Sequence, residues 1–413
     1  MHEGENMADE YIPRTLEPVL ARASREFPVV VLTGPRQAGK TTLLQHMFGA
    51  ERRLISLEPL DVRTAAVRDP RGFLDLYGPP VIYDEIQYAP TLLPYIKERV
   101  DAERHRPGQF ILTGSQNLLL MQQVTESLAG RAAILKLLPL TQRELDGETQ
   151  RPLPWERTAP PAFIPPLSIG ALWERILRGC YPELARDVRR DARLWQASYV
   201  QTYLERDVRN LRAIGDLTLF QTFLRSLALR SASLLNQSDL ARDVGVANNT
   251  VRDWLAILEA SSQIFLLRPY YVNLGKRLIK APKVYFTDTG LLCYLVGLRD
   301  AEHAAAGPMG GALVENYVMA ELYKSFLHRG EEPPLTFWRT AAGAEVDVIV
   351  ERQPALTPVE IKASATARPE MANTLVSFRR ALGERSTDGY VLYPGQAILP
   401  LGGGVLAWPL SAL

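Results

Sequence analysis

A run near the N-terminus has the residue types and the spacing that bind phosphate groups. It fits G-x-x-x-x-G-K-[ST] at every position, and its members are Gly34, Pro35, Arg36, Gln37, Ala38, Gly39, Lys40, Thr41 and Thr42. The glycines let backbone N–H groups turn inward, the lysine can reach β- and γ-phosphates, and the Thr41 hydroxyl can ligate Mg²⁺. The run therefore predicts a nucleotide-binding loop, with ATP and Mg²⁺ as its ligands.

Two neighbouring acids, Asp84 and Glu85, follow an apolar stretch at residues 80–83. Taken alone, such a pair is an ordinary solvated loop. After a complete phosphate-binding loop, the catalytic interpretation is favoured, because this strand end lies beside the loop in folds of this type. Asp84 would then hold the Mg²⁺ hydration shell, and Glu85 would orient and deprotonate the attacking water.

The elements that must position these residues can be read from the hydrophobic pattern. Residues 14–27 have helical spacing, residues 27–33 form a short β-branched run typical of a buried parallel strand, and a helix begins at residue 41. A later strand over residues 109–114 delivers Ser115 and Gln116, which are candidate γ-phosphate sensors or, alternatively, the cap of the next helix. Arg131 is either an arginine finger for a neighbouring subunit or a surface arginine.

The run from Gly34 to Glu144 resembles a prokaryotic family of AAA+ ATPases that carry a C-terminal domain of unknown function. The likeness rests on the phosphate loop, on Tyr83-Asp84-Glu85, on Leu112-Thr113-Gly114-Ser115-Gln116 and on Leu128-Ala129-Gly130-Arg131. It covers nearly the whole chain, including residues 179–183 and 202–208, although many members would have glycine where Cys180 stands. The resemblance implies ATP binding, assembly into a ring such as a hexamer, and work on DNA.

Composition and net charge narrow the classes of protein that fit the sequence. The chain has 413 residues, 46% of them hydrophobic, and a formal net charge of +1, so we expect several globular units and only a local surface for nucleic acid. Cys180 and Cys293 lie far apart, which argues against a disulfide framework or a cysteine zinc site. The acidic, polar N-terminus is no secretory signal, and no apolar run is long enough for a membrane span. We expect a cytoplasmic protein without a membrane partner.

Proline marks a boundary between residues 11–146, the AAA+ P-loop ATPase domain, and the rest of the chain. Residues 147–170 contain six prolines and form a linker, and residues 171–230 have the spacing of a helical connector.

Residues 231–300 follow the pattern of a winged helix-turn-helix domain, with a helix over 238–244, a turn at Gly245 and a helix over 247–258. Strands over 263–271 and 283–286 would form the wing. The side chains that could touch DNA are polar or basic: Asn248, Asn249, Thr250, Arg252, Lys276, Arg277 and Lys280, with Lys283 as a fourth basic residue of the wing. A plain protein–protein module is the alternative.

Residues 308–413 carry an order of acids typical of restriction-endonuclease-like domains of the PD-(D/E)xK type. Glu315 lies on a predicted helix, Asp347 on a hairpin, and Glu360 and Lys362 on one face of a further strand. Asp347 and Glu360 would hold Mg²⁺, Glu315 would complete the site, and Lys362 would stabilise the hydroxide or the phosphorane charge. Such a domain either cleaves DNA or serves as a DNA-holding or assembly module.

The sequence thus predicts an α/β protein with three modules: a P-loop AAA+ ATPase domain, a winged-helix domain and a C-terminal α/β restriction-endonuclease-like domain. A DNA-remodelling translocase or helicase, active as an oligomer and suited to branched DNA, fits all three. The alternatives are a nucleotide-switched binding protein with a catalytically silent C-terminal domain, and transcriptional control through the winged helix.

Overall fold

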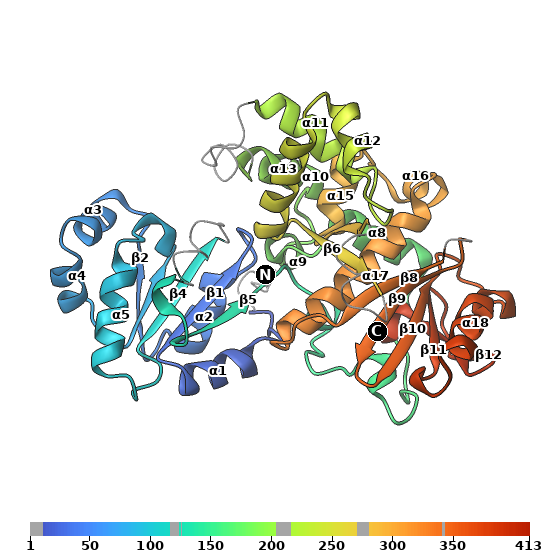
Figure 1. Cartoon of the computed structure of the whole chain (residues 1–413), viewed down its shortest axis with the longest axis horizontal. Coiled ribbons are helices and arrows are strands. Elements are labelled where there is room, and N and C mark those ends of the chain that lie inside the picture. The colour runs from blue at the N-terminus through green and yellow to red at the C-terminus, as the bar shows by residue number, and fades with distance from the viewer. Residues whose placement is uncertain (1–10, 116–123, 125, 204–215, 271–280, 341–342) are drawn as a thin grey trace, which may run out of the picture.

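The computed structural model of the chain describes residues 11–115, 124, 126–203, 216–270, 281–340 and 343–413. Figure 1 shows an N-terminal part in blue, a group of helices in green and yellow, and a C-terminal part in orange and red. The long helix α17 (Gly310–His328) reaches from the C-terminal part toward the N-terminal part. In the part of the chain that the structure describes, no helix is long and apolar enough to cross a membrane.

The N-terminal part is a five-stranded parallel sheet in the order β2-β3-β4-β1-β5. Its strands are β1 (Val29–Gly34), β2 (Arg53–Ser56), β3 (Val81–Asp84), β4 (Phe110–Ser115) and β5 (Ala132–Lys136). Its helices are α1 (Glu17–Glu26), α2 (Lys40–Phe48), α3 (Leu60–Arg68), α4 (Pro70–Leu76), α5 (Leu92–Ala102) and α7 (Gln142–Leu145).

Both faces of this sheet are buried, which explains why its strands are nearly continuous apolar runs. Along β1, Val29 and Val31 pack into one core with α4 and α5, whereas Val30 and Leu32 pack into another with α1 and α2. The parallel arrangement brings the ends of β1, β3 and β4 to one edge of the sheet.

The proline-rich stretch between residues 147 and 170 packs against the rest of the protein. Leu153 and Leu167 are 0% and 5% exposed. The Trp155 ring meets the ring of Tyr390 from the C-terminal sheet, with centroids 5.9 Å apart. The linker therefore packs against the folded parts on either side of it. It contains a short 3₁₀ turn at Pro154–Glu156.

The middle of the chain is helical. Its helices are α8 (Ile169–Arg178), α9 (Pro182–Arg186), α10 (Ala192–Tyr203), α11 (Leu217–Ala228), α12 (Gln237–Val244), α13 (Asn248–Ala260), α15 (Thr289–Leu295) and α16 (Ala301–Ala306). The Asn236 side chain caps α12, and Gly245 ends it with a left-handed φ of +78° before α13 begins. The predicted helix-turn-helix elements are therefore present.

The C-terminal part is an eight-stranded sheet in the order β12-β13-β11-β10-β9-β8-β6-β7. Its strands are β6 (Ile264–Pro269), β7 (Lys283–Phe286), β8 (Leu335–Arg339), β9 (Glu345–Arg352), β10 (Ala355–Ile361), β11 (Gly389–Tyr393), β12 (Leu399–Gly402) and β13 (Val405–Pro409). Helix α18 (Asn373–Leu382) packs against β9 and β10, and α17 packs against β10. The candidate acids lie on β9, β10 and α17.

This sheet crosses the boundary that the sequence placed between residues 300 and 308. Strands β6 and β7, expected as a separate wing, join the C-terminal strands because Arg268 and Pro269 of β6 pair in parallel with Thr336 and Phe337 of β8. One hydrophobic core runs from the linker through the helices to the last strand. The predicted modules after residue 147 therefore share a core.

Candidate nucleotide site and acidic cluster

The phosphate loop joins β1 to α2, as its sequence predicts. A Cβ atom on Gly34 would lie 1.9 Å from the Leu137 carbonyl oxygen, so only glycine fits this close approach. Gly39 precedes α2 with a left-handed φ of +92°. The first N–H groups of α2 and its helix dipole therefore point at the space that the loop encloses.

Lys40 is 6% exposed and turns back over the loop. Its ammonium donates to the carbonyl oxygens of Gly34 at 3.1 Å and Pro35 at 2.9 Å. The positive charge of Lys40 is thus held inside the loop. The same loop contains Arg36, Gln37 and Ala38, of which Ala38 is fully buried.

Three side chains meet at the edge of the sheet: those of Thr41, Asp84 and Thr113, the last from β4. The Thr41 hydroxyl lies 3.2 and 3.1 Å from the two carboxylate oxygens of Asp84. Thr113, which is fully buried, also donates its hydroxyl to Asp84. Burial raises the pKa of Asp84, and the hydrogen bonds from Thr113 and Thr41 offset part of that rise.

Glu85 has a left-handed backbone, with φ of +60°, which is unusual for a residue other than glycine. Its backbone N–H donates to the Thr113 hydroxyl at 3.2 Å, and the Gln87 amide donates to its carboxylate. Thr113 therefore positions both acids. Ser115 pairs with Gly34 in the register of β4 and β1, so the sensor position lies beside the loop, but Gln116 lies outside the described residues.

Arg131 lies at the opposite edge of the sheet from the loop, just before β5. Its carbonyl oxygen accepts from the N–H of Val29, the first residue of β1, and its guanidinium binds both oxygens of Asp101, at 2.6 and 2.9 Å. The structure thus places Arg131 away from its own domain's loop. Its role as a finger toward a neighbouring subunit stays a prediction.

A cavity of about 160 Å³ adjoins the phosphate loop. It is lined by Tyr11, Ile12, Arg14, Gly39, Thr42, Leu140, Pro182 and Arg186. Pro182 comes from the turn in which Cys180 replaces the glycine expected from the family resemblance. The Cys180 side chain does not line this cavity, and its backbone N–H and carbonyl bind Asp288 and Leu140 at 2.7 and 2.9 Å.

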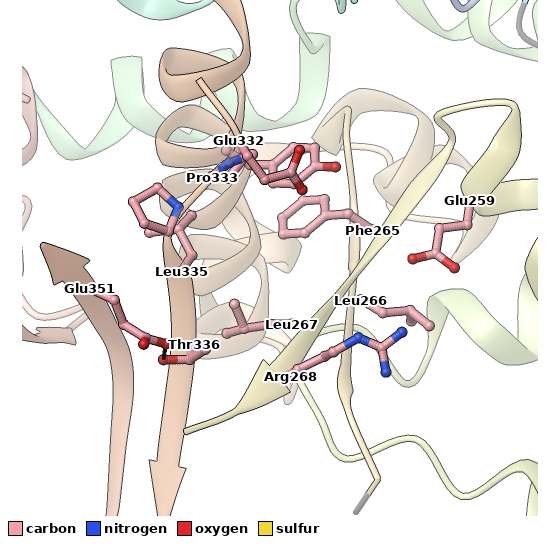
Figure 2. A pocket seen from close by; sticks show the side chains of 12 residues that line it. Glu259, Phe265, Leu266, Leu267, Arg268, Glu332, Pro333, Leu335, Thr336 and Glu351 are labelled. Carbon is pink, nitrogen blue, oxygen red and sulfur yellow. Dashed lines mark hydrogen bonds between the residues drawn. The ribbon is translucent and has the colours of Figure 1, made fainter. Parts of the chain in front are cut away.

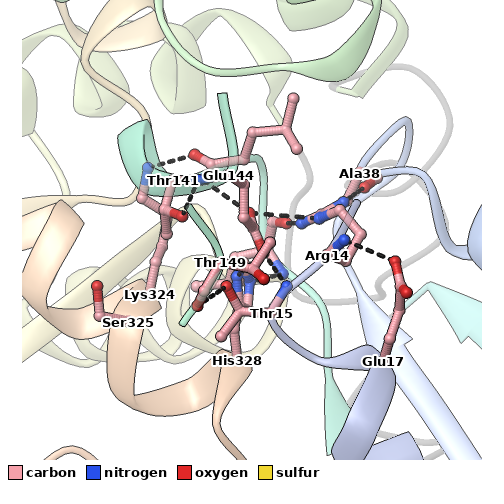
Figure 3. Close-up of polar contacts among 12 residues, drawn as sticks. Arg14, Thr15, Glu17, Ala38, Thr141, Glu144, Thr149, Lys324, Ser325 and His328 are labelled. Atoms are coloured by element: carbon pink, nitrogen blue, oxygen red, sulfur yellow. Dashed lines mark hydrogen bonds and ion pairs between the residues drawn. The ribbon is translucent and has the colours of Figure 1, made fainter. Parts of the chain in front are cut away.

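A buried polar network connects the loop with α17 (Figure 3). Arg14 donates to the carbonyl of Ala38 at 2.9 Å and lies 3.3 Å from the carboxylate of Glu144. Glu144 in turn lies 3.1 Å from Nδ1 of His328, and both side chains are fully buried. Two side chains, Arg14 and Glu144, therefore join the loop to the end of α17.

Protonation in this network follows from the hydrogen bonds. The Leu138 N–H donates to Nε2 of His328, so a neutral imidazole carries its proton on Nδ1 and donates it to Glu144. Burial lowers the pKa of His328 despite the neighbouring carboxylate. Burial alone would raise the pKa of Glu144, but Arg14 and His328 outweigh it and hold that pKa below its ordinary value.

Further along α17, Glu321 and Lys324 bind the backbone near the end of the N-terminal domain. Glu321 accepts from the N–H of Gln142 at 2.6 Å, and Lys324 donates to the carbonyl of Leu140 at 2.7 Å. These contacts fix one side of α17 to residues 138–144.

The candidate DNA-contacting residues of α13 lie on its outer surface. Asn248, Asn249 and Arg252 are exposed, and Thr250 is partly buried. Arg252 lies 3.6 Å from the carboxylate of Asp253, so its charge is partly matched. Lys276, Arg277 and Lys280 lie outside the described residues.

The acids of the C-terminal domain converge as their order predicts. Glu315 lies on α17, Asp347 on β9 and Glu360 on β10, with Lys362 directly after that strand. The Ile361 N–H donates to Asp347 at 2.8 Å, and Lys362 donates to Glu360. Burial, then repulsion from Glu360 and Glu315, raises the pKa of Asp347 well above its ordinary value.

Lys283 corrects one expectation. It was counted with the basic residues of the wing, but it is only 3% exposed and its ammonium points into the acidic cluster. It lies 3.0 Å from Glu315 and 2.5 Å from Glu345, and Tyr285 donates to the same Glu315 oxygen at 2.6 Å. Within the described ranges, no group of three or more His, Cys, Asp or Glu residues is arranged to hold a metal ion, so the metal role stays a prediction.

A second cavity, of about 520 Å³, lies between β6 and β8, where the two strands diverge (Figure 2). Glu259, Arg268, Glu332 and Glu351 stand around it, and Phe265 forms part of its wall. None of the predicted site residues lines this cavity.

Comparisons with known proteins agree with the fold of the N-terminal part. Residues 26–146 match the family described as AAA domain, residues 169–302 a domain of unknown function (DUF8612), and residues 310–413 a domain of unknown function (DUF4143). The parallel sheet, the loop and this match define a P-loop ATPase domain of the AAA type. The predicted ATPase domain and the C-terminal domain of unknown function are thereby confirmed.

Two mycobacterial proteins resemble nearly the whole chain. They are Uncharacterized protein Rv2008c of Mycobacterium tuberculosis (strain ATCC 25618 / H37Rv) and Uncharacterized protein Mb2031c of Mycobacterium bovis (strain ATCC BAA-935 / AF2122/97). Each is 32% identical over 397 residues, which span 95% of this chain and 82% of the relative. The chain therefore belongs to the same family as these two proteins.

Among solved structures, the Walker-type ATPase PABY2304 of Pyrococcus abyssi has 16% identity and a TM-score of 0.46, over 70% of this chain and 99% of that chain. At that TM-score, the likeness supports no statement about function.

Sequence reasoning missed several residues that organise these sites. The sequence marks Thr113 as a candidate site residue, because it is a polar residue in an otherwise apolar strand. Arg14, Glu144 and His328 gave none, because they come from three distant segments and only the folded chain joins them. Lys283 was noticed, but its position beside a basic run suggested exposure.

Proposed function

We propose that the chain binds and hydrolyses ATP with Mg²⁺, and that the nucleotide cycle drives its action on DNA as an oligomer. The observation that carries the ATPase proposal is the meeting of Thr41, Asp84 and Thr113 at the sheet edge, with Glu85 adjoining. A hydroxyl and a carboxylate side by side at the start of α2 fit the oxygen ligands that Mg²⁺ prefers.

Each residue of the loop has a role that its geometry supports. Bound Mg²⁺ would neutralise charge on the β- and γ-phosphates. Lys40 would exchange the loop carbonyls for phosphate oxygens, and the first N–H groups of α2 would donate to the same phosphates. Thr41 and Asp84 would hold the metal ion. Glu85 would accept a proton from the attacking water. Thr113 and Gln87 would hold Glu85 in the orientation that this transfer needs.

The nucleotide base would occupy the cavity beside the loop. That cavity adjoins Gly39 and Thr42, which lie next to the phosphate site. Its apolar walls, Ile12, Leu140 and Pro182, suit a flat heterocycle. Pro182 begins α9 of the helical part, and the Leu140 carbonyl accepts from Lys324 of α17, so a bound base would contact both sides of this junction.

Two features support DNA as the partner. Asn248, Asn249 and Arg252 are exposed polar residues at the start of a second helix, the position from which such motifs read base edges. The C-terminal sheet gathers Glu315, Asp347, Glu360 and Lys362, the order of a nuclease-like site. Ring assembly, with Arg131 reaching a neighbour's nucleotide, completes this proposal.

A second candidate is a nucleotide-switched binding protein whose C-terminal domain is catalytically silent. One observation favours it: Lys283 already pairs with Glu315, one of the three carboxylates that a nuclease would need for metal. The network from Ala38 to His328 would then carry the nucleotide state to the C-terminal domain without DNA cleavage.

Steady-state ATP hydrolysis separates the two candidates. The rate is measured with and without duplex, single-stranded and four-way-junction DNA, for the natural chain, for Glu85→Gln and for Glu103→Gln. Glu103 is exposed at the end of α5, near the opposite edge of the sheet, and serves as the matched carboxylate control. Stimulation by one DNA form, lost only in Glu85→Gln, supports the DNA-dependent motor. Slow hydrolysis that no DNA form accelerates supports the nucleotide-switched binding protein. Hydrolysis that persists in Glu85→Gln rejects the assigned catalytic site.

A further inference from the structure

The acidic cluster of the C-terminal domain contains a cation that belongs to the preceding segment of the chain. Lys283 is the first residue of β7, and its ammonium lies 3.0 Å from Glu315 on α17 and 2.5 Å from Glu345 on β9. At 3% exposure, it has almost no contact with solvent. A buried ammonium with two carboxylate partners occupies the kind of space that a small cation would fill.

The charges in this cluster nearly balance. Its anions are Glu315, Glu345, Asp347 and Glu360, and its cations are Lys283, Lys362 and Arg339. With all four acids ionised, as they would be around a bound metal ion, these groups carry a net charge of −1. Without Lys283 it would be −2, which one divalent ion neutralises.

The cluster also contains an oxygen with no partner. Glu360 is 8% exposed, and although one of its oxygens accepts from Lys362, the other is buried without a hydrogen bond. A buried carboxylate oxygen without a partner is costly, and hard divalent cations bind such oxygens well. This oxygen is therefore available to an ion that enters the cluster.

We propose that Lys283 is an internal cation that keeps divalent metal out of this cluster, and that metal binds when Lys283 leaves it. The inference rests on the proposed function, because it takes Glu315, Asp347 and Glu360 as the metal ligands. The Lys283 ammonium would repel a second cation at Glu315 and weaken its binding, because charge repulsion is only weakly screened in a site so poorly exposed to solvent. The cluster is thus a metal site held closed by a strand of the neighbouring segment.

The backbone around Lys283 shows what must move for the site to open. Lys283 pairs with Leu267 in the antiparallel β6–β7 ladder, and Tyr285, two residues along the strand, also binds Glu315. Both contacts attach β7 to α17. Withdrawal of the ammonium therefore requires β7 to shift relative to α17, or the Lys283 side chain to take another rotamer.

Mn²⁺ titration of the full chain, followed by the EPR signal of free Mn²⁺, tests the proposal. Lys283→Met removes the charge at nearly the same length and is expected to bind Mn²⁺ roughly tenfold to hundredfold more tightly than the natural chain. Lys283→Arg keeps the charge and is expected to bind as weakly as the natural chain. Adding Asp347→Asn and Glu360→Gln to Lys283→Met is expected to abolish the gain, which assigns the ion to this cluster rather than to the phosphate loop.

Lys283→Met removes the shared lysine from two partly buried carboxylates, Glu315 and Glu345, and could prevent folding, so Lys283→Met/Glu345→Gln is the second variant. It keeps the net charge of −1 and the three proposed ligands, and it is expected to bind Mn²⁺ more tightly than the natural chain. Equal affinity in the natural chain and both variants, lost on adding Asp347→Asn and Glu360→Gln, would overturn the role of Lys283 while leaving the metal site standing. If no Mn²⁺ binding depends on Asp347 and Glu360 in any variant, the metal site itself is wrong, and the inference fails with it.

Discussion

The imidazole of His328 donates from Nδ1 to a carboxylate oxygen of Glu144 at 3.1 Å, although 184 residues separate the two in the chain. Glu144 closes the N-terminal domain and His328 ends α17, whose other end carries Glu315. Arg14 binds both Glu144 and the carbonyl of Ala38. Two buried side chains, Arg14 and Glu144, therefore connect the phosphate loop with the end of α17.

Stability should fall between pH 7.5 and pH 5.5 because of His328. Its pKa is lowered in the folded state from the ordinary 6.5, so the unfolded chain takes up a proton that the folded chain refuses. The stabilisation is therefore present above pH 6.5 and is lost as the pH falls below that value, by at most about 1.4 kcal/mol per pH unit. Urea unfolding at pH 7.5, 6.5 and 5.5 measures this slope.

His328→Gln is the matched variant, because a glutamine amide can accept from Leu138 and donate to Glu144 without titrating. Its unfolding free energy should depend less on pH than that of the natural chain over this interval. The lowered pKa of Glu144 does not interfere, because its contribution is lost only below the ordinary 4.5. Parallel pH curves for the two proteins would show that His328 does not titrate as described.

Arg14→Met should reduce both stability and nucleotide affinity. The guanidinium is 4% exposed and faces the fully buried Glu144, so its removal leaves a buried charge underpaired and is expected to cost about 3 to 5 kcal/mol. The Ala38 carbonyl also loses its donor, which loosens the loop. Urea unfolding and titration with a fluorescent ATP analogue measure the two effects.

Arg14→Met/Glu144→Gln separates the two losses. It removes the unpaired charge, so most of the stability should return, whereas the nucleotide affinity should stay low because Ala38 remains without its donor. Recovery of both together would mean that Arg14 acts on the loop only through stability.

Thr113→Val should lower the rate of ATP hydrolysis more than it changes ATP binding. The hydroxyl donates to Asp84 and accepts from the backbone N–H of Glu85, so its loss disturbs the acids rather than the loop. We expect kcat to fall roughly tenfold to a hundredfold, in the range of a lost oriented group, with KM little changed. Thr113→Ser keeps the hydroxyl and should retain most of the rate. Equal rates for the valine and serine variants would exclude this positioning role.

Arg252→Glu should weaken DNA binding and reduce its dependence on salt. If Arg252 contacts phosphate, the slope of log K against log salt falls by about one unit. Fluorescence anisotropy with a labelled duplex at several salt concentrations gives the slope. Arg104→Glu changes the same charge at an exposed position beyond α5 and should leave both affinity and slope unaltered. Two variants with the same slope as the natural chain would remove α13 from the DNA-binding surface.

The N-terminal domain could be predicted closely because its signals are local. The run from Gly34 to Thr42 fixes a strand, a loop and a helix by residue type alone, and the acids follow an apolar stretch of strand length. Lys40, Thr41, Asp84 and Glu85 accordingly lie at one edge of the sheet. The positioning role of Thr113 was less predictable, because it depends on the strand inserted between β1 and β3.

The later modules were less predictable because their organisation depends on long-range pairing. The elements around Gly245 and the order of Glu315, Asp347, Glu360 and Lys362 could be read locally, and the fold gathers those acids. Nothing local indicates that β6 pairs with β8, because strand partners are chosen by tertiary packing. The same pairing turns Lys283 from an expected surface cation into a buried one.

The junction of β6 with β8 has a further consequence for the solubility of any shorter form of this protein. A fragment starting after residue 300 would lack β6 and β7 and would present the unpaired side of β8 to solution. Such an open row of backbone donors and acceptors is a template for strands of other molecules, so the fragment should aggregate. Strands β6 and β7, which precede residue 300, therefore shield the C-terminal sheet from self-association.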